Sequence, residues 1–377
     1  MHMHTRRILT ALTLAAALAT VGTFAQSGAV TVGIDVAQSR RAIDPNVYGV
    51  AYATATQLAD LNAPLNRYGG NNTSRYNWQI NADNRGQDWY FQSIAESSAT
   101  AGTRGDDFIG AAKSAGAQPA VTIPTIGWVA RIGANRAKLA SYSVAKYGPQ
   151  TGSDSQWFPD AGNGIRSSDG AKITWNDQAD ANTPNNATIQ RGWINQLVTR
   201  WGVAANGGLK YYILDNEPSL WHETHRDVHA TGATMEEVRD YMLAYASEVK
   251  NADPGASVIG PEEWGWLGTK LSGYDQQYGN TNGWPAWSSL PDRSSHGQTD
   301  YLPWLLQQVQ QQSAIEDRRL LDVFTSHYYP RGPGGRQRHD VCPDGHGQHV
   351  DLPGAGVQRQ RGVGVLESGD DPGAVTD

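Results

Sequence analysis

Residues 211–218 read Tyr-Tyr-Ile-Leu-Asp-Asn-Glu-Pro, an apolar run that stops abruptly in polar residues. Such a run predicts a buried parallel strand, which must end before Pro218 because proline cannot donate to the ladder. Glu217 would then follow the carboxyl end of a strand, where α/β barrels keep their reactive groups. A carboxylic acid there can protonate a leaving oxygen while Asn216 binds a sugar hydroxyl, which suits glycoside cleavage. The alternative is that Glu217 only caps a helix that begins near Ser219.

Similar strand-like runs recur on both sides of this stretch, each followed by a loop or a helical segment. The predicted strands lie at residues 47–53, 65–68, 120–123, 211–215, 258–260 and 323–329. The predicted helices lie at residues 106–113, 189–201, 234–251 and 300–309. Alternating strands and helices predict an α/β fold with a parallel sheet. Polar and acidic residues at the carboxyl ends of these strands favour a TIM-type (β/α)8 barrel. The barrel is incomplete here, because about six strands are present.

Composition excludes several classes of protein. A chain of 377 residues is a normal length for one α/β barrel with insertions. The net charge of -7 argues against a nucleic-acid surface. The 13 Trp and 16 Tyr suit surfaces that contact both apolar and hydroxylated groups, as sugars do, although aromatic residues are also common in cores. The single cysteine, Cys342, leaves no disulfide framework, and no recognisable zinc spacing is present.

The amino terminus has the pattern of a secretion signal. Arg6 and Arg7 precede an apolar run at 8–21 that is too short to span a bilayer, and small residues fit cleavage after Ala25. We therefore expect residues 1–25 to be a signal peptide and the mature protein to be secreted and extracellular, without membrane attachment. An uncleaved anchor is the alternative.

Two further segments lie outside the barrel pattern. Residues 26–46 contain an alternation of apolar and polar positions at 30–36, which predicts a half-buried strand of an accessory β layer. Residues 142–186 form a polar insertion that is too long for an idle connection and contains Trp157, Phe158 and Trp175. This insertion is either a cleft wall or a mobile surface excursion.

Motifs distributed along the chain resemble those of glycoside hydrolase family 44. If residues 47–53 are the first strand, the Asn-Glu pair follows the fourth. The matching segments include Asn-Arg-Tyr-Gly-Gly-Asn at 66–71, Leu-Asp-Asn-Glu-Pro at 214–218 and Gly-Pro-Glu-Glu-Trp-Gly-Trp at 260–266. The others are at 74–79, 123–128, 143–150, 224–229 and 326–330. The resemblance covers about residues 30–330.

The resemblance implies an endo-acting β-1,4-glucanase whose substrates include cellulose derivatives, xyloglucan and related plant-wall β-glucans. Cleavage would proceed with retention, through a covalent glycosyl-enzyme. It also implies a barrel at residues 47–330, joined to a β-sandwich built from both ends of the chain. No cofactor is implied for the chemistry; a structural calcium ion is implied, with ligands that cannot be assigned. We expect a monomer whose partner is the polysaccharide.

By matching motif, Glu217 would be the acid/base residue and Asn216 would orient the sugar. The other candidate substrate-binding residues are Asn71, Trp78, Trp128, Trp264, Trp266 and Tyr328. For each tryptophan alone, core packing is an equally good explanation.

The resemblance stops after about Arg331, where the composition changes. Residues 331–377 contain no aromatic residue and include the only cysteine, Cys342. Such a segment is typical of disorder. We interpret it as the product of a reading-frame slip in GC-rich coding sequence, with a natural flexible linker as the alternative. The genomic DNA across the codons for residues 329–335 would decide between them.

This change has a chemical consequence. A retaining mechanism needs two carboxyl groups about 5 Å apart. The family nucleophile should follow a seventh strand, so we expect it to be absent from this chain. Glu262 and Glu263 come too early and are expected to shape the cleft, and Glu367 lies in the aberrant tail. We therefore expect a poorly soluble, nearly inactive chain. A xylanase or mannanase, or a non-catalytic glucan-binding protein, are the alternatives.

Overall fold

The computed structural model describes residues 33, 35–38 and 40–328, so the predicted signal peptide and aberrant tail lie outside it. The chain divides into two compact units, Met1–Asp44 and Pro45–Asp377. In the first unit, Asp35 accepts a hydrogen bond from the backbone N–H of Ala37 at 2.9 Å. Most of the predicted strand at 30–36 is not described, and its described positions are not in a strand. That strand stays a prediction.

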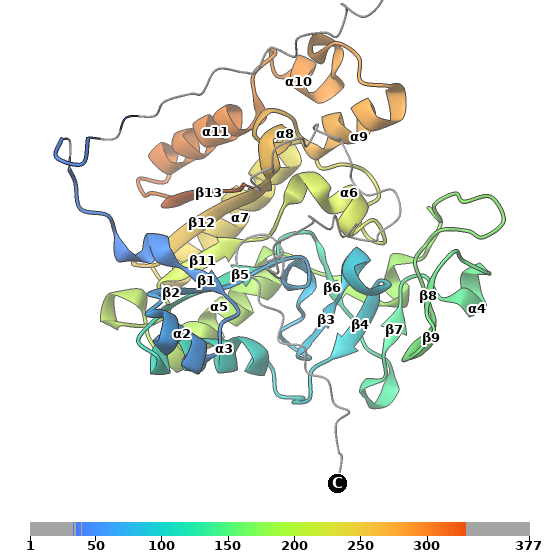
Figure 1. The fold of residues 1–377 in the computed structure, drawn as a ribbon, viewed down its shortest axis with the longest axis horizontal. Coiled ribbons are helices and arrows are strands. Elements are labelled where there is room, and N and C mark those ends of the chain that lie inside the picture. The colour runs from blue at the N-terminus through green and yellow to red at the C-terminus, as the bar shows by residue number, and fades with distance from the viewer. Residues whose placement is uncertain (1–32, 34, 39, 329–377) are drawn as a thin grey trace, which may run out of the picture. The chain divides into compact units, whose positions relative to one another are not determined.

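The second unit is built on a six-stranded sheet whose spatial order follows the chain. The strands are β1 (Val50–Ala51), β2 (Leu65–Tyr68), β5 (Gln118–Ile123), β11 (Tyr211–Leu214), β12 (Ser257–Trp264) and β13 (Val323–His327). All five neighbouring pairs are parallel. The sheet curls as an incomplete TIM-type barrel, which confirms the predicted fold class (Figure 1). The first strand is much shorter than predicted, and the fifth is longer.

Helices connect these strands, and shorter strands lie beside them. The helices are α2 (Ala55–Leu61), α3 (Thr103–Ser114), α4 (Val144–Tyr147), α5 (Ala187–Trp201), α6 (Trp221–Thr224), α7 (Met235–Ala252), α8 (Gly265–Lys270), α9 (Gly273–Asn282), α10 (Pro291–Ser295) and α11 (Tyr301–Ile315). Two 3-10 helices matter below, η3 (Gly86–Trp89) and η7 (Pro218–Leu220). The four predicted helices correspond to α3, α5, α7 and α11.

The helix starts agree with the sequence pattern in part. The predicted start of α3 at Asp106 is wrong, because Gly102, at φ 72°, is the N-cap and the helix begins at Thr103. Thr234 does cap α7 by accepting from the backbone N–H of Glu237. The Glu237 carboxylate pairs with His229 at 2.9 Å.

The main core lies where α5 and α7 pack on the sheet. Trp193 and Leu197 of α5 and Met242 and Val249 of α7 are buried together with Tyr212 of β11. Their spacing puts these side chains on one face of each helix, which is why the apolar pattern at residues 189–201 predicted a helix correctly. Burying each large apolar side chain contributes about 1.5–3 kcal/mol to stability. The packing of α5 and α7 therefore stabilises the position of β11, the strand that precedes Glu217.

The long insertion is an ordered part of the fold. It contains the hairpin of β8 (Ser153–Asp154) and β9 (Phe158–Gly162), and β10 (Asn182–Pro184), which pairs antiparallel with β6 (Trp128–Ala130). A further antiparallel sheet joins β3 (Ala82–Asn84), β4 (Gln92–Ala95) and β7 (Leu139–Ala140). Figure 1 shows these small strands grouped on one side of the main sheet.

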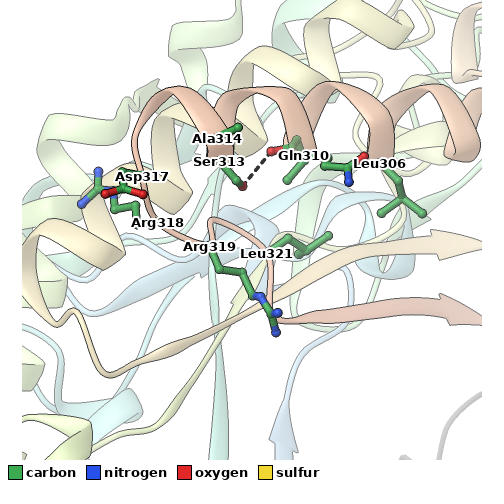
Figure 2. A pocket seen from close by; sticks show the side chains of 9 residues that line it. Leu306, Gln310, Ser313, Ala314, Asp317, Arg318, Arg319 and Leu321 are labelled. Carbon is green, nitrogen blue, oxygen red and sulfur yellow. Dashed lines mark hydrogen bonds between the residues drawn. The ribbon is translucent and has the colours of Figure 1, made fainter.

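Strand β13 is an edge of the sheet in the part of the chain that the structure describes. Within the described ranges it pairs only with β12, and its residues Val323 and Phe324 are exposed. A hollow of about 490 Å³ lies near its first residues, lined by α11 and the connection that follows (Figure 2). Parallel strands all run the same way, so this hollow lies at the opposite edge from Glu217. It is not the site of the predicted chemistry.

Candidate active site

Polar side chains from four strands meet at the carboxyl edge of the sheet. Arg67 belongs to β2, Glu217 follows β11, Glu262 belongs to β12 and His327 ends β13. All four are buried or nearly so. This is the edge at which α/β barrels hold their catalytic residues, as the position of Glu217 in the sequence predicted.

The backbone around Glu217 is held in an uncommon conformation. Asp215 and Glu217 have φ values of 60° and 47°, in the left-handed region. Such a conformation costs a non-glycine residue about 1–3 kcal/mol and is often found at functional sites. The buried Asp215 carboxylate offsets it by accepting hydrogen bonds from the Thr125 hydroxyl at 3.0 Å and from the backbone N–H groups of Ile126 and Asn216 at 2.9 and 2.8 Å.

His327 bridges two glutamates. Its Nδ1 lies 2.5 Å from Glu217 Oε1, and its Nε2 lies 2.7 Å from Glu262 Oε2. Arg67 Nη2 donates to the same Glu262 oxygen at 2.7 Å. Glu262 is therefore bonded to both Arg67 and His327. Glu217 is linked through the His327 ring to β13, the last strand in the order of the sheet.

The charges of this network reinforce one another. Burial alone would lower the pKa of His327, but its hydrogen bonds to Glu217 and Glu262 raise it to about 9. Burial alone would raise the pKa of Glu262, but the charge of Arg67 and the bond to His327 lower it to about 2. At neutral pH His327 is thus an imidazolium that donates from both ring nitrogens.

Glu263 differs from its neighbour. It is fully buried, and desolvation raises its pKa to about 7 against hydrogen bonds from Ser219 and the backbone of Trp264. The Ser219 hydroxyl donates to it at 2.6 Å, and the Trp264 N–H donates at 2.7 Å. Glu262 and Glu263 are both buried beside Glu217, and their expected part in shaping the cleft stays a prediction. They hold the end of β12 against η7 and against β13.

Two of the predicted substrate-binding residues, Asn216 and Asn71, are bonded to each other, and Asn216 directly precedes Glu217. Asn216 accepts from Arg67 at 2.9 Å and donates to Asn71 at 3.1 Å. Asn71 in turn donates to Asp88 at 3.1 Å. These bonds fix the orientation of both amides next to the acid.

Three of the predicted aromatic residues lie on elements next to the site. Trp264 is half-buried and pairs in register with His327 across the last two strands. Trp266 is exposed in α8, directly after β12, with Lys270 Nζ 5.3 Å from the centre of one of its rings. Tyr328 directly follows β13 and is 80% exposed.

The other two tryptophans pack into the scaffold. Trp78 and Trp128 are half-buried against the main core. The indole N–H of Trp78 donates to the backbone oxygen of Ile189 in α5 at 3.3 Å. Their role in sugar binding stays a prediction.

Sequence reasoning did not assign roles to Arg67 and His327, although both lie in segments that carry the family resemblance. The sequence feature that could have identified them is an ionisable residue within a predicted strand. Arg67 lies in the predicted strand at 65–68, and His327 lies in the one at 323–329. A charged residue inside a buried parallel strand is unusual and indicates a partner or a function.

One group of described side chains has the residue types of a metal site. Glu236, Asp292 and His296 bring potential ligand atoms within 4.8 Å of one another. They do not fit calcium, because it prefers an all-oxygen shell and His296 supplies nitrogen. His296 Nε2 already pairs with Glu236 Oε1 at 2.8 Å, and Asp292 accepts from the backbone of Met235 at 2.9 Å. We assign no metal role to them.

A curled parallel sheet with a glutamate after its fourth strand, next to an asparagine and an Arg-Glu-His network, defines a barrel-type glycoside hydrolase. The model of glycoside hydrolase family 44 matches residues 82–332, so the chain belongs to that family.

Three relatives show how this chain compares with known proteins. The crystal structure of CelM2, a bifunctional glucanase-xylanase from a metagenome library, is 63% identical with a TM-score of 0.76, over 78% of this chain and 56% of that one. Endoglucanase A of Paenibacillus lautus is 30% identical over 346 residues, which are 89% of this chain and 44% of the relative. A Paenibacillus polymyxa family 44 xyloglucanase, solved with xyloglucan, is 26% identical with a TM-score of 0.57, over 80% of this chain and 55% of that one. The chain thus spans about half the length of these relatives.

Proposed function

We propose that this chain binds β-1,4-linked plant-wall glucans, such as xyloglucan and cellulose derivatives, with Glu217 as the acid/base residue of a retaining endo-glucanase. The observation that carries the proposal is the placement of Glu217 at the carboxyl edge of the sheet, bonded to His327 and next to Asn216. The names of the relatives agree with a glucan substrate: one is an endoglucanase and another a xyloglucanase.

The site suggests how these residues would act. In its protonated form, Glu217 would give its carboxyl proton to the glycosidic oxygen as the bond breaks, which can contribute about 10²–10⁴-fold to the rate. His327 holds the Glu217 carboxyl through Oε1. Asn216, fixed by Arg67 and Asn71, would bond the 2-hydroxyl of the sugar, an interaction that strengthens in the transition state.

A second carboxylate is needed for a covalent intermediate, about 5 Å from the first. Two glutamates in the described part of the chain adjoin Glu217, and both are engaged: Glu262 by Arg67 and His327, and Glu263 by Ser219 and Trp264. Neither is presented to a sugar as a nucleophile. We therefore propose that the 377-residue chain binds glucan but cleaves it far more slowly than its longer relatives.

We further propose where the protein acts and in which oligomeric state. The Arg6-Arg7 pair and the apolar run at 8–21 support secretion, which would bring the chain to an extracellular polysaccharide. Among the residues that the structure describes, no helix is long and apolar enough to cross a membrane. We propose that the secreted chain is a monomer; gel filtration with light scattering would test this.

A substrate panel tests the function. The purified chain is examined by affinity electrophoresis and by reducing-sugar release on xyloglucan, hydroxyethylcellulose, xylan and mannan. We expect retardation by the two glucans, with weak hydrolysis that the Glu217→Gln variant loses. Preference for xylan or mannan would favour the alternative enzymes. Binding with hydrolysis that does not depend on Glu217 would contradict the assigned role, and robust turnover would contradict the slow cleavage.

A further inference from the structure

Two exposed tryptophans from distant parts of the chain lie side by side outside the site described above. Trp89 ends η3, and Trp157 lies in the turn between β8 and β9. Their ring centres are 5.6 Å apart, with an angle of 44° between the planes. Trp157 is 59% exposed and Trp89 is 38% exposed, so both rings still present surface to solvent.

One buried carboxylate, Asp154, bonds the indole of Trp89 and the backbone of Trp157. Asp154 Oδ2 accepts from the indole N–H of Trp89 at 3.2 Å, and Asp154 Oδ1 accepts from the backbone N–H of Trp157 at 3.1 Å. Gln92 donates to the same side chain at 2.7 Å. Burial alone would raise the pKa of Asp154, but these three hydrogen bonds lower it, so it stays ionised. The Trp89 ring and the turn that carries Trp157 are therefore positioned before any ligand arrives, which lowers the entropy cost of binding.

The pair is continuous with the predicted sugar-binding asparagines. Asn216 donates to Asn71, and Asn71 donates to Asp88, the residue directly before Trp89. A line of contacts thus leads from the amide beside Glu217, along η3, to the tryptophan pair. A ligand that starts at Asn216 and extends over Asp88 would reach these rings.

We propose that Trp89 and Trp157 form an outer subsite that stacks on the pyranose rings of a β-1,4-glucan beyond the sugar held at Asn216. This inference rests on the proposed function. A β-1,4-glucan backbone is extended and offers flat C–H faces that match an exposed indole, while its hydroxyls stay in water. An exposed aromatic patch that is rigidly supported is a common mark of a ligand surface.

The simpler explanation is that the two rings only pack the β8–β9 hairpin onto η3. The two explanations differ in what Trp157→Ala should do. As a subsite residue, its loss weakens glucan binding by about 2- to 10-fold, the effect of one aromatic stack. As a packing residue only, its loss lowers thermal stability and leaves binding by the folded protein unchanged.

The chain offers a matched control in Trp175. It belongs to the same insertion and is 56% exposed, but the Arg166 guanidinium lies 5.2 Å from the centre of one of its rings. Trp175→Ala therefore removes an equally exposed indole whose neighbour is Arg166. Trp157→Phe keeps an aromatic ring in the pair and should give intermediate affinity, and it decides the question if Trp157→Ala does not fold.

The experiment is affinity electrophoresis of the 377-residue chain and these variants in xyloglucan gels, with thermal melts of each. We expect Trp157→Ala to lose most of the retardation, Trp157→Phe to lose part of it, and Trp175→Ala to match the parent. Equal retardation of the parent and both Trp157 variants overturns the subsite, and the proposed function survives if the parent is still retarded. A folded parent that xyloglucan does not retard at all overturns both.

Discussion

The side chains of Glu217 and His327 are bonded at 2.5 Å although 110 residues separate them in the chain. Glu217 follows the fourth strand of the sheet, and His327 ends the sixth. The bond therefore connects the carboxyl ends of β11 and β13, which lie on either side of β12. It makes the position of the predicted acid depend on the last strand.

Replacing His327 should destabilise the fold. His327→Gln leaves Glu217 and Glu262 without the cation between them, and breaking a buried ion pair in this way costs about 3–5 kcal/mol. Urea denaturation at pH 6 would measure the change. Lys172→Gln is a control, because Lys172 pairs with Glu223 at 2.6 Å on the surface and its loss should cost about 1 kcal/mol or less. Equal losses for the two variants would contradict the role given to His327.

The network should also fix how stability depends on pH. The pKa of His327 is raised from 6.5 to about 9, so its contribution is complete below pH 6.5 and is lost as the pH rises through 9. The pKa of Glu262 is lowered from 4.5 to about 2, so its contribution is complete above pH 4.5 and is lost as the pH falls through 2. Chemical denaturation should show greatest stability near pH 4.5–6.5. A maximum near pH 9 would be incompatible with this network.

Glu263 gives a separate pH effect. Its pKa is raised from 4.5 to about 7, so the folded state binds its proton more tightly, and stability falls as the pH rises from 4.5 through 7. Glu263→Gln removes this titration while keeping an acceptor for the Ser219 hydroxyl. We expect the variant to lose less stability than the parent between pH 5 and pH 8. Parallel stability curves across that range would show that Glu263 is already ionised.

Asn216 should matter for binding more than for folding. Asn216→Ala removes the acceptor of Arg67 and the donor to Asn71 at the rim of the site. Loss of one such hydrogen bond to a sugar costs about 0.5–1.5 kcal/mol, so xyloglucan affinity should fall roughly 2- to 10-fold. Asn206→Ala, in a distant exposed turn, should leave it unchanged. Unaltered retardation of Asn216→Ala would remove this residue from the site.

Much of the sheet could be predicted because its strands are buried runs that end in polar residues. The strand at 211–215 and the helix at 189–201 follow from pattern alone. The start of α3 could not be predicted in this way, since its cap is a glycine in the left-handed conformation and not an acidic side chain. Local sequence carries little information about such a cap.

The site was predicted only in part, for a physical reason. Glu217 and Asn216 adjoin a strand end, so their position is a local property. The burial of Glu262 and Glu263 depends on β13 and η7, which are distant in sequence. The same holds for the tryptophans: Trp78 packs on α5, which is distant in sequence, and Trp266 faces solvent.

The central claim is that Glu217 supplies the proton for glucan cleavage, and one comparison tests it most directly. Depolymerisation of xyloglucan by the 377-residue chain and by Glu217→Gln is followed by size-exclusion chromatography over long incubations, with binding measured in parallel. We expect cleavage by the variant to fall at least about 100-fold while binding is unchanged. Cleavage that continues undiminished in Glu217→Gln would contradict the account.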